Sequence, residues 1–182
     1  MPNIALYGLP GAGKSTFARL LTQQLGTSGV PCALVKIGAP LYELQALIYS
    51  VAGRPLLEPT AQDGLLLADL AGHLRRINPT SLTDLFAAKV AAAPSGSVLV
   101  CDDMRAPDVE AVTDLGFRLV EITAPEPLRC RRRQSRGDLS QGDEQHPSEA
   151  PVEAQPWLRV HNDGDLDRLW DEAGRVAAQV LR

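Results

Sequence analysis

The chain has 182 residues, of which 45% are hydrophobic and 22% charged, values typical of one globular domain with a full core. Its formal net charge of -4 argues against a broad basic surface for nucleic acid or anionic lipid. Three widely spaced cysteines without metal-ligand or disulfide spacing, and the lack of an apolar run long enough to span a bilayer, favour a cytoplasmic protein.

The first predicted unit is a strand, a glycine-rich turn and a helix. Residues 4–7 form a short apolar run typical of a buried strand, and residues 15–25 carry Phe and Leu side chains at helical spacing. Gly26 and Gly29 end that helix, and residues 32–37 predict a second strand. Apolar strands that alternate with helices indicate a parallel sheet covered by helices on both faces.

A long helical segment is predicted next, over residues 40–93, with breaks near Gly53-Arg54-Pro55 and at Asn78-Pro79. An ordinary crossover between two parallel strands needs only one helix. We therefore interpret residues 40–93 as a helical insert that binds a substrate.

The rest of the chain continues the alternation of strands and helices. Strands are predicted over 98–101, 117–123 and 158–161, and helices over 108–115, 125–134 and 166–181, the last with Asp165 as its N-cap. Residues 135–156 are polar and rich in Gly, Pro and acidic side chains, which is typical of a mobile loop within a domain. The chain is thus expected to be a single domain over residues 1–182.

The turn after the first strand, Gly8-x-x-x-x-Gly13-Lys14-Ser15, matches the Walker A pattern and stands between a strand and a helix, as phosphate binding requires. Its glycines let backbone N–H groups surround an anion at the positive end of the helix dipole. Lys14 can reach the β- and γ-phosphates, and the Ser15 hydroxyl can bind Mg²⁺. The ATP-binding residues expected here are Gly11, Ala12, Gly13, Lys14, Ser15 and Thr16. The predicted fold class is therefore α/β, a P-loop NTPase fold of three α/β/α layers with a five-stranded parallel sheet.

Two aspartates, Asp102 and Asp103, follow the strand predicted over 98–101, at the edge where ligands bind in open α/β sheets. One of them is expected to contact Mg²⁺ through water, beside Ser15, and Asp103 is the preferred candidate. The alternative is that an aspartate caps the helix that follows.

Arginines gather on and just after the helix predicted over 125–134, at Arg129, Arg131, Arg132, Arg133 and Arg136. Beside a glycine-containing polar loop, this cluster predicts a lid over about residues 129–156 that closes over transferring phosphates. Arg132, Arg133 and Arg136 would then act with Lys14 as catalytic residues that neutralise charge. The alternative is a solvated helix face whose arginines pair with acids such as Asp138.

Several short segments point to one family by their order along the chain. Besides the Walker A motif they are Ala39-Pro40-Leu41, Leu70-Ala71-Gly72 with Arg75-Arg76 and Asn78-Pro79, Asp103-Met104-Arg105-Ala106-Pro107-Asp108, Arg133-x-x-Arg136-Gly137-Asp138, His146-Pro147-Ser148-Glu149 and Asn162-Asp163-Gly164. With them the chain resembles P-loop nucleoside monophosphate kinases over almost its whole length. The resemblance is greatest to the deoxynucleoside-monophosphate-kinase-like branch, which also includes animal-type phosphomevalonate kinases. The turn at Ala39-Pro40 lacks the Asp of that branch's Ala-Asp-Pro-Leu segment, which leaves the identity of the acceptor open.

The resemblance implies transfer of the γ-phosphoryl group of ATP, with Mg²⁺, to a nucleoside or deoxynucleoside 5′-monophosphate. It places Asn162 near the adenine. An ionised phosphate acceptor needs positioned positive charge and no general base. The residues expected to bind the acceptor are Lys36, Arg75, Arg76, Arg105 and Glu149. Because neighbouring helical residues diverge by about 100°, only one of Arg75 and Arg76 can face it.

Two other functions remain open from the sequence. A P-loop kinase of a small-molecule hydroxyl or of another phosphorylated metabolite would use Asp102 or Asp103 as a base. A GTP-dependent switch is suggested by Asp69-x-x-Gly72, but this segment lies in an amphipathic run, and no Asn-Lys-x-Asp motif is present for guanine. The oligomeric state cannot be read from the sequence, and a homodimer is one alternative.

Overall fold

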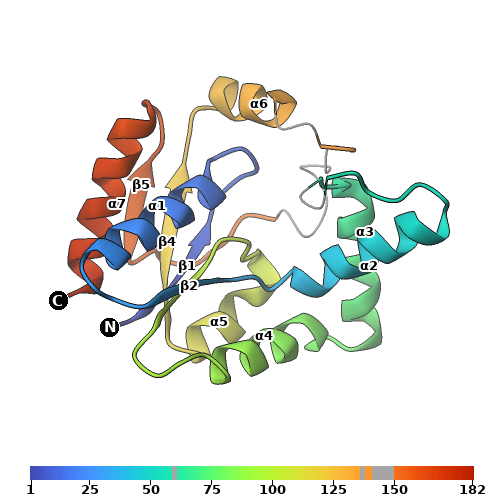
Figure 1. The fold of residues 1–182 in the computed structure, drawn as a ribbon, viewed down its shortest axis with the longest axis horizontal. Coiled ribbons are helices and arrows are strands. Elements are labelled where there is room, and N and C mark those ends of the chain that lie inside the picture. Colours follow the sequence, from blue (N-terminus) through green and yellow to red (C-terminus); the bar gives the residue numbers. More distant parts are fainter. Residues whose placement is uncertain (59–60, 136–137, 141–149) are drawn as a thin grey trace.

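Five parallel strands form the centre of the molecule, in the order β2-β3-β1-β4-β5 (Figure 1). The computed structural model describes residues 1–58, 61–135, 138–140 and 150–182. The strands are β1 (Asn3–Tyr7), β2 (Cys32–Val35), β3 (Val98–Cys101), β4 (Phe117–Thr123) and β5 (Leu158–His161). Every pair of neighbouring strands is parallel.

Helices cover both faces of this sheet. They are α1 (Lys14–Thr27), α2 (Ala39–Val51), α3 (Gly64–Ile77), α4 (Ser81–Ala91), the 3-10 turn η1 (Ala106–Asp108), α5 (Val109–Asp114), α6 (Glu126–Ser135) and α7 (Leu166–Val180). Figure 1 shows α1 and α7 together on one side of the sheet, α4 and α5 on the other, and α6 above the upper strand ends. The three-layer α/β/α arrangement expected from the sequence is confirmed.

Two apolar cores result from the alternation of side chains along the strands. On β1, Ile4 and Leu6 point to one face and are fully buried beside Phe17 of α1. Ala5 and Tyr7 point to the other face, where the second core includes side chains of α2 to α5. Both faces of the central strands are therefore buried, which explains why these strands are apolar without interruption.

The order of the strands places the loops after β1 and β3 next to each other. The chain runs from β1 to the edge strand β2, returns to β3 beside β1, and then crosses to β4 on the other side of β1. The connections that leave β1 and β3 therefore run to opposite sides of the sheet. Open α/β sheets bind ligands at such a switch point, outside the carboxyl ends of the strands. The loops there carry the Walker A segment and the Asp102-Asp103 pair.

Most of the predicted elements are confirmed, and the strands over 98–101, 117–123 and 158–161 agree to the residue. Both breaks predicted in the helical segment over residues 40–93 are confirmed, since α2 ends at Val51 and α3 ends at Ile77. Described residues between α2 and α3 contain no helix, because Gly53 takes a left-handed φ of 71° and Pro55 cannot continue the hydrogen-bond ladder. No helix in the described part of the chain is long and apolar enough to cross a membrane.

Replacing Asp165 by Ala should lower the free energy of unfolding by about 1 kcal/mol. Asp165 is the N-cap of α7, and its carboxylate accepts the Arg168 N–H at 2.9 Å, which would lose this partner. Denaturant unfolding measures the change, with Asp171→Ala as a matched control because Asp171 is exposed on the same helix. Equal losses in the two variants would contradict the role of the cap.

Candidate functional site

The Walker A turn, called the P-loop below (residues 8–16), needs glycine where its backbone approaches other elements. Gly13, the N-cap of α1, has a φ of 97°, and a Cβ there would collide with Nδ2 of Asn162. Gly11 has a φ of 79°, and a Cβ would lie 2.5 Å from the Arg129 carbonyl oxygen. Both the left-handed backbone and the lack of space exclude a side chain.

Asn162, which follows β5, and arginines of α6 contact the P-loop or each other through hydrogen bonds. The amide of Asn162, which is buried, donates through Nδ2 to the Ala12 carbonyl at 2.7 Å and accepts through Oδ1 from Nη2 of Arg132 at 3.2 Å. Arg129 Nη1 donates to the Pro10 carbonyl at 3.3 Å. The arginine-rich helix is therefore attached to the P-loop directly by Arg129 and indirectly, through Asn162, by Arg132.

Lys14 is the first residue of α1, and its Nζ lies 2.7 Å from the Gly8 carbonyl oxygen. The N-cap of α1 is Gly13, which has no side chain to accept a hydrogen bond from the first N–H groups of the helix. Those N–H groups, the helix dipole and the Lys14 ammonium together favour an anion in front of the loop.

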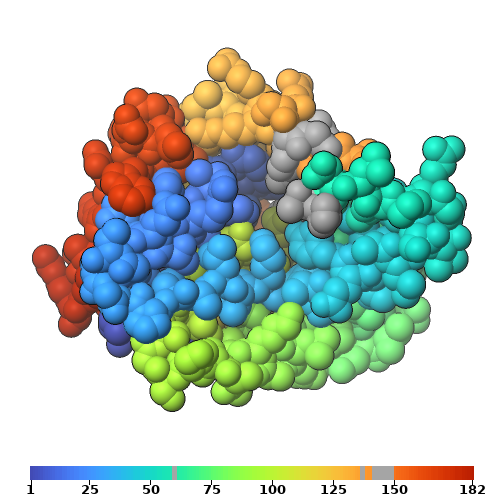
Figure 2. All heavy atoms as spheres, viewed as in Figure 1, coloured from blue at the N-terminus to red at the C-terminus, as the bar shows by residue number. Residues whose placement is uncertain are grey.

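A large cavity of about 1360 Å³ opens in front of the P-loop, and the hollow between α1, α2 and α6 is visible in Figure 2. We call it the donor cavity. Its lining includes Gly11, Gly13, Lys14, Ser15, Thr16, Lys36, Asp102, Asp103, Arg105, Arg132 and Arg133. Most residues that the sequence assigned to ATP and Mg²⁺ are therefore brought together around one space.

Asp102 and Lys36 form an ion pair at the back of the donor cavity, with Nζ 2.7 Å from Oδ1. Asp102 is buried, whereas the Lys36 side chain is 38% exposed. Burial lowers the pKa of Lys36, but the Asp102 and Asp103 carboxylates together outweigh that effect and raise it above the ordinary value. The lysine therefore stays protonated beside the cavity.

Asp103 has different partners from Asp102. Its Oδ1 accepts the Ile37 N–H at 3.0 Å and its Oδ2 accepts the Gly38 N–H at 2.9 Å. Burial raises the pKa of Asp103, while the two N–H donors and the Lys36 ammonium oppose that rise. The sequence preferred Asp103 for Mg²⁺, and both aspartates line the donor cavity with Ser15, but Asp103 uses both of its oxygens on the turn before α2. A hydrated Mg²⁺ needs only one or two protein oxygens, which Ser15 and Asp102 can supply.

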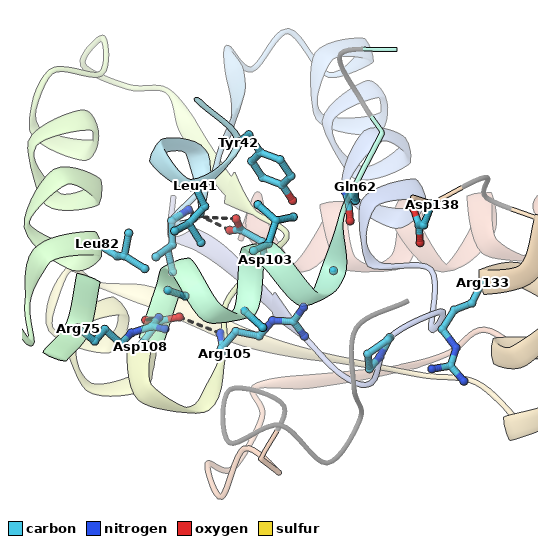
Figure 3. Close-up of a pocket in the computed structure, with 17 residues that line it drawn as sticks. Leu41, Tyr42, Gln62, Arg75, Leu82, Asp103, Arg105, Asp108, Arg133 and Asp138 are labelled. Carbon is cyan, nitrogen blue, oxygen red and sulfur yellow. Dashed lines mark hydrogen bonds and ion pairs between the residues drawn. The ribbon is translucent and has the colours of Figure 1, made fainter. Parts of the chain in front are cut away.

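A second cavity of about 150 Å³ lies between the strand ends and the helical insert, and we call it the acceptor cavity (Figure 3). Its floor is apolar and its walls are charged. The floor consists of Ile37, Leu41, Leu67, Ala68, Ala71 and Leu82. The polar lining includes Tyr42, Gln62, Arg75, Asp103, Arg105, Asp108, Arg133 and Asp138.

One buried carboxylate organises the inner end of the acceptor cavity. Asp108, only 1% exposed, pairs through Oδ1 with Nη2 of Arg75 at 2.8 Å and accepts the Arg105 backbone N–H through Oδ2 at 3.0 Å. Arg75 thus faces the cavity, whereas Arg76 is exposed and lines neither cavity. The structure thereby resolves which of the two adjacent arginines points inward, and Arg76 is not brought to the site.

The donor and acceptor cavities meet at a shared wall. Six residues line both of them: Pro10, Tyr42, Gln62, Asp103, Arg105 and Arg133. In Figure 3, Asp103 and Arg105 lie between the Arg75–Asp108 pair and Arg133. A group held in one cavity can therefore reach a group held in the other at this junction.

The lid region and the insert contact each other beside the junction. Residues Asp63 and Ser140 form a parallel β-bridge, and the Ser140 hydroxyl hydrogen-bonds to Oδ1 of Asp63. The Leu65 N–H donates to Ser140 Oγ at 3.1 Å, and Tyr49 donates to the other Asp63 oxygen at 2.7 Å. We call this contact the clasp (Tyr49, Asp63, Leu65 and Ser140).

Some predicted residues lie elsewhere. Arg136 and Glu149 fall outside the described residues. Ala12, within the P-loop, and Asn162, which donates to the Ala12 carbonyl, do not line the donor cavity, so their contacts with ATP stay predictions.

Among the polar residues of the acceptor cavity that the sequence analysis missed as site residues are Tyr42, Gln62 and Asp108. For Asp108 a signal existed, since it ends the Asp103–Asp108 segment. No motif marks Tyr42 or Gln62.

No protein-family model matches the sequence. No curated protein matches it significantly either. Solved structures do match, and they show the fold.

The APS kinase of Mycobacterium tuberculosis, solved with AMPPNP and APS, is 19% identical at a TM-score of 0.56, covering 100% of this chain and 99% of that one. The shikimate kinase of Acinetobacter baumannii, solved with shikimate, is 16% identical at 0.54, with 100% and 93% covered. A gluconokinase of Sinorhizobium meliloti is 15% identical at 0.52, with 98% and 93% covered. The chain therefore has the fold of P-loop kinases.

Replacing Ser140 by Ala should speed hydrogen exchange of the Leu65 amide, because that N–H loses the Ser140 hydroxyl as an acceptor. The Leu66 amide is an internal control, since it donates to Asp63 Oδ1 at 3.1 Å and keeps that partner. Hydrogen exchange followed by NMR measures the rates of the Leu65 and Leu66 amides separately. Unchanged exchange at Leu65, or equal acceleration at both amides, would contradict the clasp.

Proposed function

We propose that this chain transfers the γ-phosphoryl group of ATP to a nucleoside or deoxynucleoside 5′-monophosphate, forming the diphosphate. One observation carries the proposal: a P-loop cavity and a smaller cavity meet at a wall that contains Arg105 and Arg133. Phosphoryl transfer between two phosphates requires both to be held in line and their combined charge to be neutralised.

The donor side would hold ATP with Mg²⁺ against the P-loop. Lys14 and the N–H groups at the start of α1 would bind the β- and γ-phosphates, and Ser15 with Asp102 would hold the hydrated ion. The ion would supply charge neutralisation at the phosphate oxygens. The AMPPNP bound to the APS kinase of the same fold supports ATP as the donor.

The acceptor side would bind a group that is already ionised. Arg105 and Arg133 supply positive charge at the junction, and Arg132 lies beside them on the donor side. Both oxygens of Asp103 accept backbone N–H groups, which leaves this carboxylate poorly placed to remove a proton. An attacking phosphate oxygen needs no such proton transfer, so the arrangement favours a monophosphate acceptor.

A kinase of a small-molecule hydroxyl is the second candidate. The three structural neighbours are named as kinases of APS, shikimate and gluconate. Each of these molecules carries hydroxyl groups, which fits this candidate. Burial also raises the pKa of Asp103, as a general base requires. A GTP switch has less support, because Asp69 is exposed within α3 and far from any strand end.

An acceptor panel separates the two candidates. We expect ADP formation to rise above the ATPase background with at least one nucleoside or deoxynucleoside monophosphate, and not with shikimate, gluconate or other alcohols. The assay measures ADP release from MgATP with each acceptor. A rise confined to alcohols would overturn the proposal in favour of the hydroxyl kinase.

Replacing Lys14 by Ala should reduce turnover by about 100-fold or more, because the transferring phosphate loses its charged partner. Steady-state ADP release measures the loss, and thermal unfolding checks that the variant is folded. Lys89→Ala is the matched control, since Lys89 is exposed near the end of α4 and lines neither cavity. Unchanged turnover in Lys14→Ala would exclude the P-loop as the donor site.

A further inference from the structure

The reacting phosphate of an acceptor has to lie where the two cavities meet. Only there can it approach the γ-phosphate of a nucleotide on the P-loop to the short distance that transfer needs. The charged residues common to both cavities are Asp103, Arg105 and Arg133. The remainder of the acceptor must then extend away from the junction.

Arg75 does not lie at the junction. It lines the acceptor cavity but not the donor cavity, and the same is true of its partner Asp108. Figure 3 shows this pair beside Leu82, with Arg105 between it and Arg133. Arg75 therefore stands at the inner end of the acceptor cavity, which the part of the acceptor remote from its reacting phosphate would reach.

The positive charge of Arg75 is balanced locally. The Asp108 carboxylate lies 2.8 Å from Arg75 and is buried, so the pair as a whole is close to neutral. A neutralised pair attracts a second phosphate weakly. Its remaining guanidinium N–H groups still donate hydrogen bonds in a fixed plane, and such a planar donor suits the carbonyl or ring nitrogen of an uncharged group.

We infer that Arg75, held by Asp108, reads the nucleobase of the acceptor, while Arg105 and Arg133 hold its phosphate. This inference rests on the proposed function and revises the role that the family resemblance implied for Arg75, a contact with the acceptor phosphate. Arg75 is then a residue that determines specificity, and Asp108 is a positioning residue that acts through it. The apolar floor formed by Leu67, Ala68 and Ala71 covers one face of the base.

The test compares a complete acceptor with one that lacks the base. Equilibrium binding is measured by calorimetry, with a non-hydrolysable ATP analogue and Mg²⁺ present, for AMP, GMP, CMP, UMP and dTMP and for ribose 5-phosphate. Arg75→Gln should weaken the tightest of the nucleotides at least about tenfold and change ribose 5-phosphate less than about twofold, because lost hydrogen bonds to a polar edge discriminate strongly. Arg105→Gln should weaken both classes alike.

Two further variants test whether the effect of Arg75→Gln comes from a general loss of charge or from a loss of folding. Arg76→Gln changes the neighbouring, exposed arginine and should leave both affinities unchanged. Arg75→Lys keeps a positive charge for Asp108 but loses the planar fork, and should show the same selective loss in a chain that unfolds at the wild-type temperature. It therefore serves as the second variant if Arg75→Gln does not fold.

Each outcome decides the inference. Equal weakening of nucleotide and ribose 5-phosphate by the Arg75 variants would make Arg75 a phosphate ligand, and no weakening of either would remove it from the site. Both results overturn the assignment. Failure of the proposed function is seen separately, as selective binding of a nucleotide with no ADP release in the acceptor panel.

Discussion

Both oxygens of the Asp103 carboxylate accept backbone N–H groups, and the rest of the site depends on these two hydrogen bonds. The donors, Ile37 and Gly38, belong to the turn between β2 and α2, so the carboxylate joins the ends of two adjacent strands (Figure 3). This turn sets where α2 begins and thereby places Tyr42 in the wall between the cavities. Without Asp103, each partly buried N–H would lose its acceptor, at a cost of about 1–3 kcal/mol.

Basic side chains line the site from the P-loop to the inner end of the acceptor cavity. At the P-loop, Lys14 and the start of α1 present positive charge. At the junction, Arg105 and Arg133 face both cavities. At the inner end, Asp108 neutralises Arg75. The proposed function needs positive side chains beside both phosphates, and Lys14 at the P-loop and the two arginines at the junction would supply them.

Local patterns in the sequence predicted the sheet, the P-loop and the N-cap at Asp165, because each depends on neighbouring residues. The site was predictable only in part. Nothing local could assign Arg75 to Asp108, since 33 residues separate them and their contact joins α3 to the loop after β3. The clasp joins residues 77 positions apart. Helical periodicity could show that Arg75 and Arg76 diverge, but only the packing of α3 decides which one faces the acceptor cavity.

Binding of a ligand that spans both cavities tests most directly that they form one joined donor and acceptor site. Dinucleoside pentaphosphates, with adenosine at one end and each of the common nucleosides at the other, can be titrated calorimetrically in the presence of Mg²⁺. If the two cavities form one joined site, at least one dinucleoside pentaphosphate should bind about 100-fold or more tightly than ATP alone. The reason is that binding of its second nucleoside becomes intramolecular. A joined site also predicts that Arg105→Gln removes most of this gain. Affinities equal to that of ATP for every member of the series would contradict the joined site.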